Sequence, residues 1–132
     1  MNKTFKLSLV LCTASFFFAG CTSTPKVGSA KVPKAYYIAE FDLKNADTFK
    51  PYHAGVPKTV SDYGGKYLVR GGETVSLEGS PPKRIVLFEF NSLADAKKWY
   101  NSPEYSALRP HRQKSGDTRN FIVESFVDAL PD

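Results

Sequence analysis

Four short stretches of the sequence are rich in aromatic and β-branched residues and are bounded by Gly, Pro, Asn and Asp. This pattern is typical of β-strands. We predict strands over residues 35–43, 66–70, 83–90 and 119–127. The third stretch is almost entirely apolar, which indicates a central strand that is covered on both faces.

A helix is predicted between the first two strands, because apolar residues recur there at intervals of three and four positions. Asn45 or Asp47 can cap its N-terminus, and the helix should end near Asp62. Pro57 lacks the N–H that a helix interior needs, so we expect a kink or break near Gly55–Val56. The apolar stripe of this helix comprises Phe49, Tyr52, His53, Val56, Val60 and Tyr63.

Two further helical segments follow the third strand. Asn91 or Ser92 can cap the first of them, which Ser102–Pro103 interrupts, and residues 104–114 can form another short helix. The order of elements is then βαββαβ. This order predicts an α+β, ferredoxin-like fold, a split βαβ plan with an antiparallel sheet and its helices on one face.

Helices on one face leave the other face of the predicted sheet without a cover. That face should carry Tyr36, Ile38 and aromatic residues of the neighbouring strands. Monomeric soluble proteins rarely leave such an apolar patch in water. A second copy of the sheet is the simplest cover, and we therefore expect a two-fold homodimer in which two sheets face each other as a dimeric α/β barrel.

Two Gly-Gly pairs bracket the second predicted strand. Gly64–Gly65 should end the preceding helix, and Gly71–Gly72 should open a loop that reaches Pro82. Regular alternation places Tyr67 and Val69 on one side of the strand, with Leu68 and Arg70 on the other. An arginine on a mostly apolar sheet face is the main hint of a site. The loop is long enough to cover a pocket or to contact a partner.

The first 20 residues predict a secretory signal, because Lys3 and Lys6 precede an apolar run that is too short for a typical membrane-spanning helix. Residues 18–21, Phe-Ala-Gly-Cys, resemble the lipobox of bacterial lipoproteins, in which the cysteine becomes the lipid-bearing N-terminus. Lipidation at Cys21 would hold the protein at a bilayer through several acyl chains, such as palmitate. The alternative is ordinary signal-peptide cleavage, with no role for Cys21.

The residues beyond the leader divide into three parts. Residues 21–34, rich in Thr, Ser, Lys and Pro, predict a flexible tether, residues 35–127 form the domain, and residues 128–132 are a C-terminal tail. Thr22 rather than Asp follows the cysteine. By resemblance to enterobacterial sorting, this residue favours a place in the bacterial cell envelope, at the outer membrane and facing the periplasm.

Charge and cysteine content exclude several functions. The formal net charge is +5, and removal of Lys3 and Lys6 with the leader leaves 16 basic and 13 acidic residues, a balance of +3. There is no dense basic stripe, so we expect no nucleic-acid binding. Cys12 would leave with the leader and Cys21 would carry lipid. The mature domain would then have no thiol for a disulfide, for catalysis or for a metal.

Several polar residues are candidates for ligand binding. Arg70 can pair with Glu78, with Glu89 or with an anionic ligand, and a structural ion pair is the plainer alternative. A second group can form one wall of a cavity between the second helical region and the sheet, or can be ordinary core and solvated rim. Its members are Trp99, Tyr105, Arg109, His111 and Arg112.

Catalysis has weaker support in the sequence. His53 and His111 can each act as a general base near neutral pH, but a single histidine in an apolar stripe is more often a satisfied core residue. Arg70 and Glu89 are the other candidates for a catalytic role. No Asp, Glu and His residues have the spacing of metal ligands, and no nucleophile-elbow, P-loop or dinucleotide motif is present. We expect neither a metal nor a cofactor.

The sequence resembles the bacterial "domain of unknown function 1330" family, within the dimeric α/β-barrel superfamily. The resemblance spans roughly residues 35–126. It is carried by Tyr63-Gly64-Gly65-Lys66-Tyr67-Leu68-Val69-Arg70-Gly71-Gly72, Leu77-Glu78-Gly79, Glu89-Phe90, Ala96, Trp99-Tyr100-Asn101-Ser102-Pro103-Glu104-Tyr105, Arg109 and Arg112. The resemblance implies the fold, but it implies no settled activity or cofactor.

These observations leave two main functional hypotheses. The first is a lipid-anchored, dimeric module of the cell envelope that binds a small molecule or a partner. The alternative is a cofactorless enzyme, monooxygenase-like or isomerase-like, that acts on a small aromatic or acidic compound. A third interpretation, haem handling, would require His53 or His111 to face a large open cavity.

Overall fold

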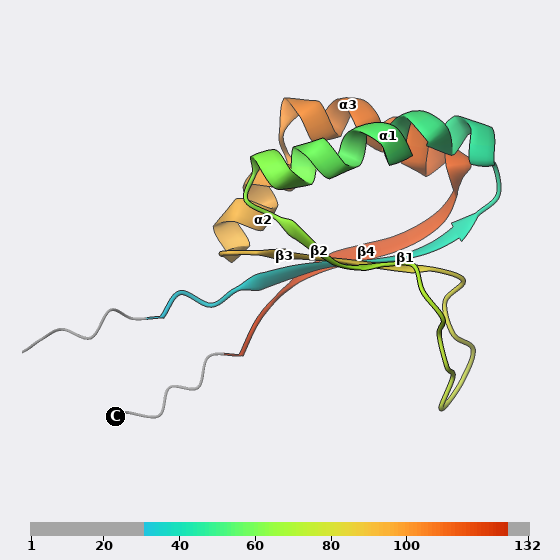
Figure 1. Cartoon of the computed structure of the whole chain (residues 1–132), viewed down its shortest axis with the longest axis horizontal. Helices are drawn as coiled ribbons and strands as arrows, with labels where there is room; N and C mark the ends of the chain where they lie inside the picture. Colours follow the sequence, from blue (N-terminus) through green and yellow to red (C-terminus); the bar gives the residue numbers. More distant parts are fainter. Residues whose placement is uncertain (1–30, 127–132) are drawn as a thin grey trace, which may run out of the picture.

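The computed structural model describes residues 31–126, which form one four-stranded antiparallel sheet and three helices (Figure 1). The predicted leader, Cys21, most of the tether and the C-terminal tail lie outside the described residues. The elements are β1 (Ala35–Leu43), α1 (Ala46–Asp62), β2 (Lys66–Arg70), β3 (Ile85–Phe90), α2 (Leu93–Tyr100), α3 (Pro103–Ser115) and β4 (Gly116–Glu124).

The strands lie in the order β2-β3-β1-β4, and each neighbouring pair is antiparallel. All three helices lie on the same face of the sheet (Figure 1). The ferredoxin-like prediction is therefore confirmed, as is the place of β3 inside the sheet. None of the helices in the described part of the chain is both long enough and apolar enough to cross a membrane.

Helix α1 begins and ends with hydrogen bonds that its sequence predicts. The Asn45 side chain accepts a hydrogen bond from the Thr48 N–H at 3.1 Å. At the other end Gly64 takes a φ of 72°, and the Gly65 N–H donates to the Val60 carbonyl at 2.8 Å, which satisfies a terminal carbonyl. The expected break at Pro57 was wrong, because the helix is continuous through it. The carbonyl that Pro57 leaves without a donor belongs to His53, on the exposed side of the helix where water can replace the donor.

Strand β4 begins three residues earlier than predicted, because α3 passes into it without a loop. The Ser115 carbonyl accepts hydrogen bonds from the Lys44 and Asn45 N–H groups, at 2.8 and 2.9 Å. A Cβ at position 116 would lie 2.0 Å from the Asp42 carbonyl oxygen, so this close approach requires glycine. Strand β3, in turn, begins two residues later than predicted, at Ile85.

Strand β2 contains an irregularity that changes which residues share a face. Tyr67 pairs with Phe88, and Val69 pairs with Leu87, so Leu68 is an extra residue in the ladder. Phe88 is buried beneath the helices, whereas Leu87 belongs to the opposite face. The predicted alternation was therefore wrong: Tyr67 and Arg70 both face the helices, and the Arg70 guanidinium lies 5.1 Å from the centre of the Tyr67 ring.

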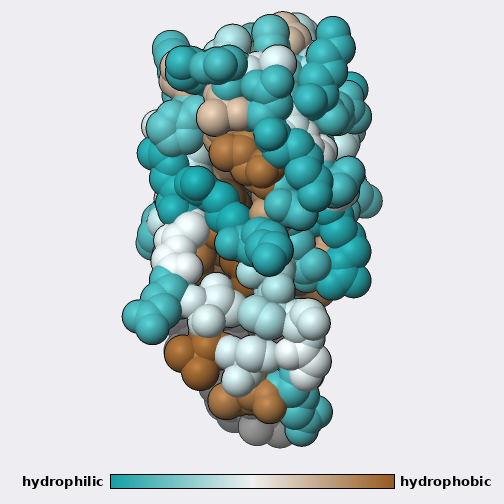
Figure 2. Space-filling view, turned by 90° about the vertical axis from the view of Figure 1, so that its right-hand side faces the viewer, coloured by the Kyte–Doolittle hydropathy of each residue, from teal (hydrophilic) through white to brown (hydrophobic). Residues whose placement is uncertain are grey.

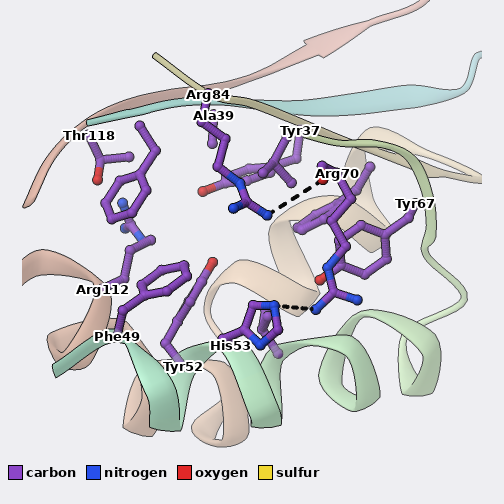
Figure 3. A pocket seen from close by; sticks show the side chains of 14 residues that line it. Tyr37, Ala39, Phe49, Tyr52, His53, Tyr67, Arg70, Arg84, Arg112 and Thr118 are labelled. Atoms are coloured by element: carbon purple, nitrogen blue, oxygen red, sulfur yellow. Dashed lines mark hydrogen bonds between the residues drawn. The ribbon is translucent and has the colours of Figure 1, made fainter. Parts of the chain in front are cut away.

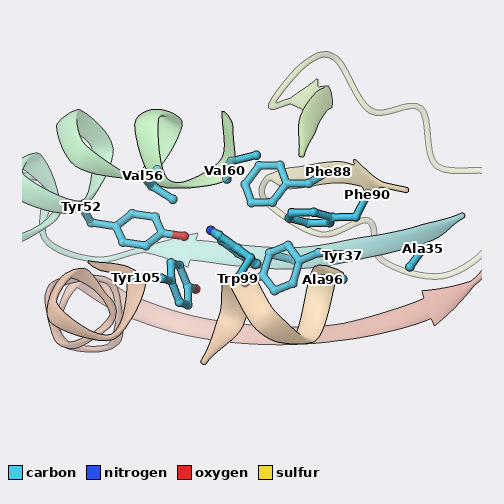
Figure 4. Packing of buried hydrophobic residues seen from close by; sticks show 11 residues of the cluster. Ala35, Tyr37, Tyr52, Val56, Val60, Phe88, Phe90, Ala96, Trp99 and Tyr105 are labelled. Carbon is cyan, nitrogen blue, oxygen red and sulfur yellow. The ribbon is translucent and has the colours of Figure 1, made fainter. Parts of the chain in front are cut away.

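The core fills the space between the helices and the sheet, and Trp99 lies at its centre (Figure 4). The centre of its ring lies 4.2 Å from the ring centre of Tyr105, 5.0 Å from that of Tyr37 and 5.4 Å from that of Phe88. The indole N–H donates to the Thr59 hydroxyl at 3.1 Å. Burial of large rings supplies most of the hydrophobic stabilisation that so small a sheet can gain.

The opposite face of the sheet has no cover within the described residues. Apolar side chains occupy its centre, namely Tyr36, Ile38, Val69, Ile85, Leu87, Phe121 and Val123. We call these seven residues the open face. Ion pairs flank them, between Arg119 and Glu40 at 2.6 Å and between Lys34 and Glu89 at 2.7 Å.

The loop of residues 71–84 extends away from the helices, on the same side as the open face (Figure 1). It carries two exposed apolar residues, Val75 and Leu77. Figure 2 looks at the end of the molecule from which this loop departs, and it shows hydrophobic surface at the bottom of the view and in a recess higher up, framed by hydrophilic side chains.

Candidate functional site

A cavity lies between the sheet and helices α1 and α3, near the end of the sheet from which the loop departs (Figure 3). Its water-accessible volume is about 30 Å³, which is room for a chemical group of a few atoms. Most of the wall is apolar or aromatic. The lining residues are Tyr37, Ala39, Phe41, Phe49, Tyr52, His53, Val56, Tyr67, Arg70, Arg84, Val86, Phe88, Arg112 and Thr118.

Arg112 brings a charged group into this cavity from α3. The residue is only 4% exposed, and its Nε has no hydrogen-bond partner among the described residues. Its guanidinium lies 6.0 Å from the centre of the Tyr52 ring, within the range of a cation–π contact. Burial works to lower the pKa of Arg112, but the phenol groups of Tyr105, Tyr37, Tyr52 and Tyr100 together outweigh it, so the pKa lies above its ordinary value. The side chain is therefore a buried cation.

Arg84 enters the same cavity from the sheet side, just before β3. Its Nε is also buried without a hydrogen-bond partner, and its Nη2 makes only a long contact of 3.5 Å with the Arg70 carbonyl. Gly71 packs beneath it with a φ of 69°, and a Cβ there would lie 3.2 Å from the Arg84 Nε. Sequence reasoning missed Arg84 as a site residue. The sequence could have indicated it, because Arg84 precedes Val86 by two positions and Phe88 by four, and alternation along a strand places all three on the helix-covered face.

Hydroxyl groups supply the remaining polar atoms of the cavity. Burial raises the pKa of Tyr37 and of Tyr52, so both phenols stay protonated and can donate a hydrogen bond. The Tyr37 hydroxyl and the Thr118 hydroxyl are buried and have no hydrogen-bond partner among the described residues. The cavity therefore holds two arginine nitrogens and two hydroxyls that no part of the described chain satisfies.

Arg70 and His53 lie together at the exposed side of the cavity (Figure 3). The Arg70 Nη2 lies 3.1 Å from the His53 Nε2. Since a guanidinium can only donate, His53 must accept through Nε2 and carry its proton on Nδ1. His53 is exposed rather than buried in the stripe of α1. Arg70 thus contacts a histidine, and it forms no ion pair with Glu78 or Glu89 within residues 31–126.

The two predicted acidic residues lie away from the cavity. Glu78 is exposed in the loop of residues 71–84. Glu89 lies on the side of the sheet away from the helices, 2.7 Å from the Lys34 ammonium and 3.8 Å from that of Lys66. The hydrogen bond from Lys34 lowers the pKa of Glu89, which favours the ionised form.

The five residues predicted as one wall separate in the structure. Only Arg112 lines the cavity, whereas Trp99 and Tyr105 are fully buried in the core. Arg109 lies over the Tyr100 ring, 5.2 Å from its centre, and His111 is exposed on α3. The small space beside His53 is far below what a porphyrin needs, so the haem interpretation finds no support. Within residues 31–126 no three His, Cys, Asp or Glu side chains cluster as metal ligands.

Solved structures share this architecture. A protein of unknown function from Rhodopseudomonas palustris superposes with a TM-score of 0.60 at 17% identity, over 72% of this chain and 84% of that chain. A dimeric ferredoxin-like protein of unknown function from Thermobifida fusca gives a TM-score of 0.50 at 10% identity, over 72% of this chain and 93% of that one. At these identities the likeness shows the fold. A search of the curated proteins found no match. Residues 34–126 match the family described as "Domain of unknown function (DUF1330)", and the chain belongs to that family.

Proposed function

We propose that the domain binds a small organic molecule in the cavity between the sheet and helices α1 and α3. The observation that carries the proposal is the set of buried polar atoms without partners, on Arg112, Arg84, Tyr37 and Thr118. Buried polar groups are almost always hydrogen-bonded, and leaving one unsatisfied costs about 1–3 kcal/mol. A bound molecule with acceptor atoms would satisfy several of them at once.

We favour binding over catalysis because of what the wall of the cavity contains. His53 at the mouth is the one imidazole, and among the described lining residues there is no carboxylate or thiol to act with it. General acid–base work usually needs a second group that orients or complements the base. The wall instead combines aromatic surface with a few polar groups, which is the usual composition of a binding pocket.

Native mass spectrometry of the protein purified from its own cells tests this proposal directly. We expect an additional mass of small-molecule size on the folded protein, which acid denaturation releases. The Val56→Trp variant is the matched comparison, because an indole ring at this buried lining position would fill the cavity. If it keeps the circular dichroism of the wild type, it should purify without the additional mass. Folded wild-type protein that carries no small molecule, and that gains none from a metabolite extract, would contradict the proposal.

The functional unit that we propose is a homodimer in which two open faces cover each other. Seven apolar residues occupy the centre of that face, and ion pairs lie at its edge, which is the arrangement of a protein–protein interface. The loop of residues 71–84, which carries the exposed Val75 and Leu77, extends to the same side and would meet the second copy. The Thermobifida fusca protein of the same fold is described as dimeric.

We further propose that the mature protein is anchored to the bacterial envelope through lipid on Cys21, at the outer membrane and facing the periplasm. Support comes from the sequence alone: a basic start, a short apolar run and the lipobox-like residues 18–21. Several acyl chains on one residue are enough for stable anchoring. The domain would then meet its ligand outside the cytoplasm.

Substitution of the cysteine tests the anchor. Cells that express the Cys21→Ser variant should incorporate no radiolabelled palmitate into this protein and should accumulate the longer, unprocessed form. Cys12→Ser is the matched control, since that residue lies inside the leader and its loss should leave labelling intact. Continued palmitate labelling of the Cys21→Ser variant would show that lipid is attached elsewhere or that the leader is of another kind.

A further inference from the structure

We infer that the ligand of this cavity is a small organic carboxylate whose apolar body packs against the aromatic wall. This inference rests on the proposed function and adds the chemical class of the ligand. The geometry that carries it is the convergence of Arg84 from the sheet and Arg112 from α3 on one apolar space (Figure 3).

The first argument for a carboxylate is the excess of positive charge in the cavity. Its described lining includes three arginines and a histidine, but no Asp or Glu. Arg112 is 96% buried, and none of the ion pairs within residues 31–126 involves it. A buried charge without a counter-charge is strongly unfavourable, and proteins normally pair it. An anion from outside the chain is the partner that this cavity lacks.

The donor groups are the second step. The unsatisfied Nε atoms of Arg84 and Arg112 are donors only, and the neutral hydroxyl of Tyr37 can donate as well. A guanidinium matches the two oxygens of a carboxylate in geometry and charge. The reachable volume of about 30 Å³ suits a group of that size.

The apolar wall is the third step, because it selects the rest of the ligand. Phe41 and Phe49 stack with ring centres 5.0 Å apart, and Val56, Val86 and Phe88 also contribute apolar surface to the lining. Inorganic phosphate has no apolar part that could pack against these side chains. Proteins normally bind it through backbone N–H groups at a helix N-terminus or a glycine-rich loop. An aromatic or short aliphatic body attached to a carboxylate matches both parts of the lining in chemistry, and the body would extend toward the exposed side of the cavity at Arg70 and His53.

Isothermal titration of the purified full-length protein, freed of retained ligand, tests the class with three probes: benzoate, the uncharged benzamide and inorganic phosphate. We expect benzoate to bind, with at least roughly tenfold weaker binding of benzamide and of phosphate. The Arg112→Gln variant should lose benzoate affinity by roughly ten- to a hundredfold. Lys114→Gln makes the same change of charge at an exposed position of α3 and should bind benzoate like the wild type.

Stability separates a binding role of Arg112 from a structural one. Since no ion pair within residues 31–126 compensates the buried charge and the Arg112 Nε has no hydrogen-bond partner there, the Arg112→Gln variant should unfold at the same denaturant concentration as the wild type or at a higher one. A large loss of stability would show that the fold requires Arg112 and would overturn the inference.

If benzamide binds as tightly as benzoate, the cavity is a small-molecule site but not a carboxylate site. If no probe binds and mass spectrometry finds no retained molecule, the proposed function itself fails.

Discussion

Replacement of Trp99 by alanine should destabilise the domain by about 3–5 kcal/mol, a large part of the total stability of a domain of this size. Trp99 is 0% exposed and packs against the rings of Tyr37, Phe88, Phe90 and Tyr105. The substitution leaves a cavity that these rings cannot close. Equilibrium denaturation followed by circular dichroism should show the loss, and the melting temperature should fall by well over ~10 °C.

Two further variants serve as controls for this result. Trp99→Phe keeps a ring but loses the indole N–H that donates to Thr59, so its cost should be about 1–2 kcal/mol. Lys97→Ala, two positions earlier and exposed, should change stability by no more than about 0.5 kcal/mol. A Trp99→Ala protein as stable as the Lys97→Ala protein would mean that the core is not organised around this indole.

The second large effect concerns the open face. The Phe121→Glu variant should be monomeric at micromolar concentration, whereas the wild-type protein should sediment as a dimer. Phe121 is 44% exposed and lies opposite Ile38, in the apolar part of the sheet. Two-fold symmetry would bury two unpaired carboxylates in one interface, so the dissociation constant should rise by roughly a thousandfold or more. Sedimentation equilibrium in detergent measures this constant.

Leu43→Glu is the matched control for the interface. Leu43 is 40% exposed, similar to Phe121, but it ends β1 and points by alternation to the other side of the sheet. This variant should remain dimeric, and both variants should keep the far-ultraviolet circular dichroism of the wild type. A wild-type protein that sediments as a monomer, or a dimeric Phe121→Glu variant, would remove the proposed interface.

The order of the elements was predictable because each one carries a local signal. Asn45 and Ser92 accept hydrogen bonds from the first turns of their helices, and Gly64 ends α1 with a positive φ. Such capping interactions involve residues close in sequence, so a sequence contains them without reference to the rest of the fold. The apolar run of residues 85–90 likewise marks a central strand, of which Phe88 and Phe90 are buried whereas Ile85 and Leu87 lie on the open face.

Two of the errors concern features that depend on contacts between distant residues. The extra residue at Leu68 exists only in the pairing of β2 with β3, and it moves Arg70 to the face of Tyr67. The early start of β4 depends on the close approach of Gly116 to Asp42, which no local pattern reveals.

The candidate site was only partly predictable for the same reason. Arg70 and Arg112 were predicted as ligand-binding residues and do line the cavity, whereas Trp99 and Tyr105 are core residues. Arg84 was missed, since a charged residue at the start of a predicted strand is usually solvated. Which charges remain without a partner depends on how three separate segments meet, and alternation within one segment does not contain that information.

The loop of residues 71–84 connects the cavity with the side of the open face. At the root, the Gly71 N–H donates to the Ile85 carbonyl at 2.8 Å, and Arg84 enters the cavity. Farther out, the loop, which carries the exposed Val75 and Leu77, extends on the side of the open face. Contact of the tip with a second subunit would restrain the segment that positions Arg84. Occupancy of the cavity and self-association would then be thermodynamically linked, so that each strengthens or weakens the other by the same factor.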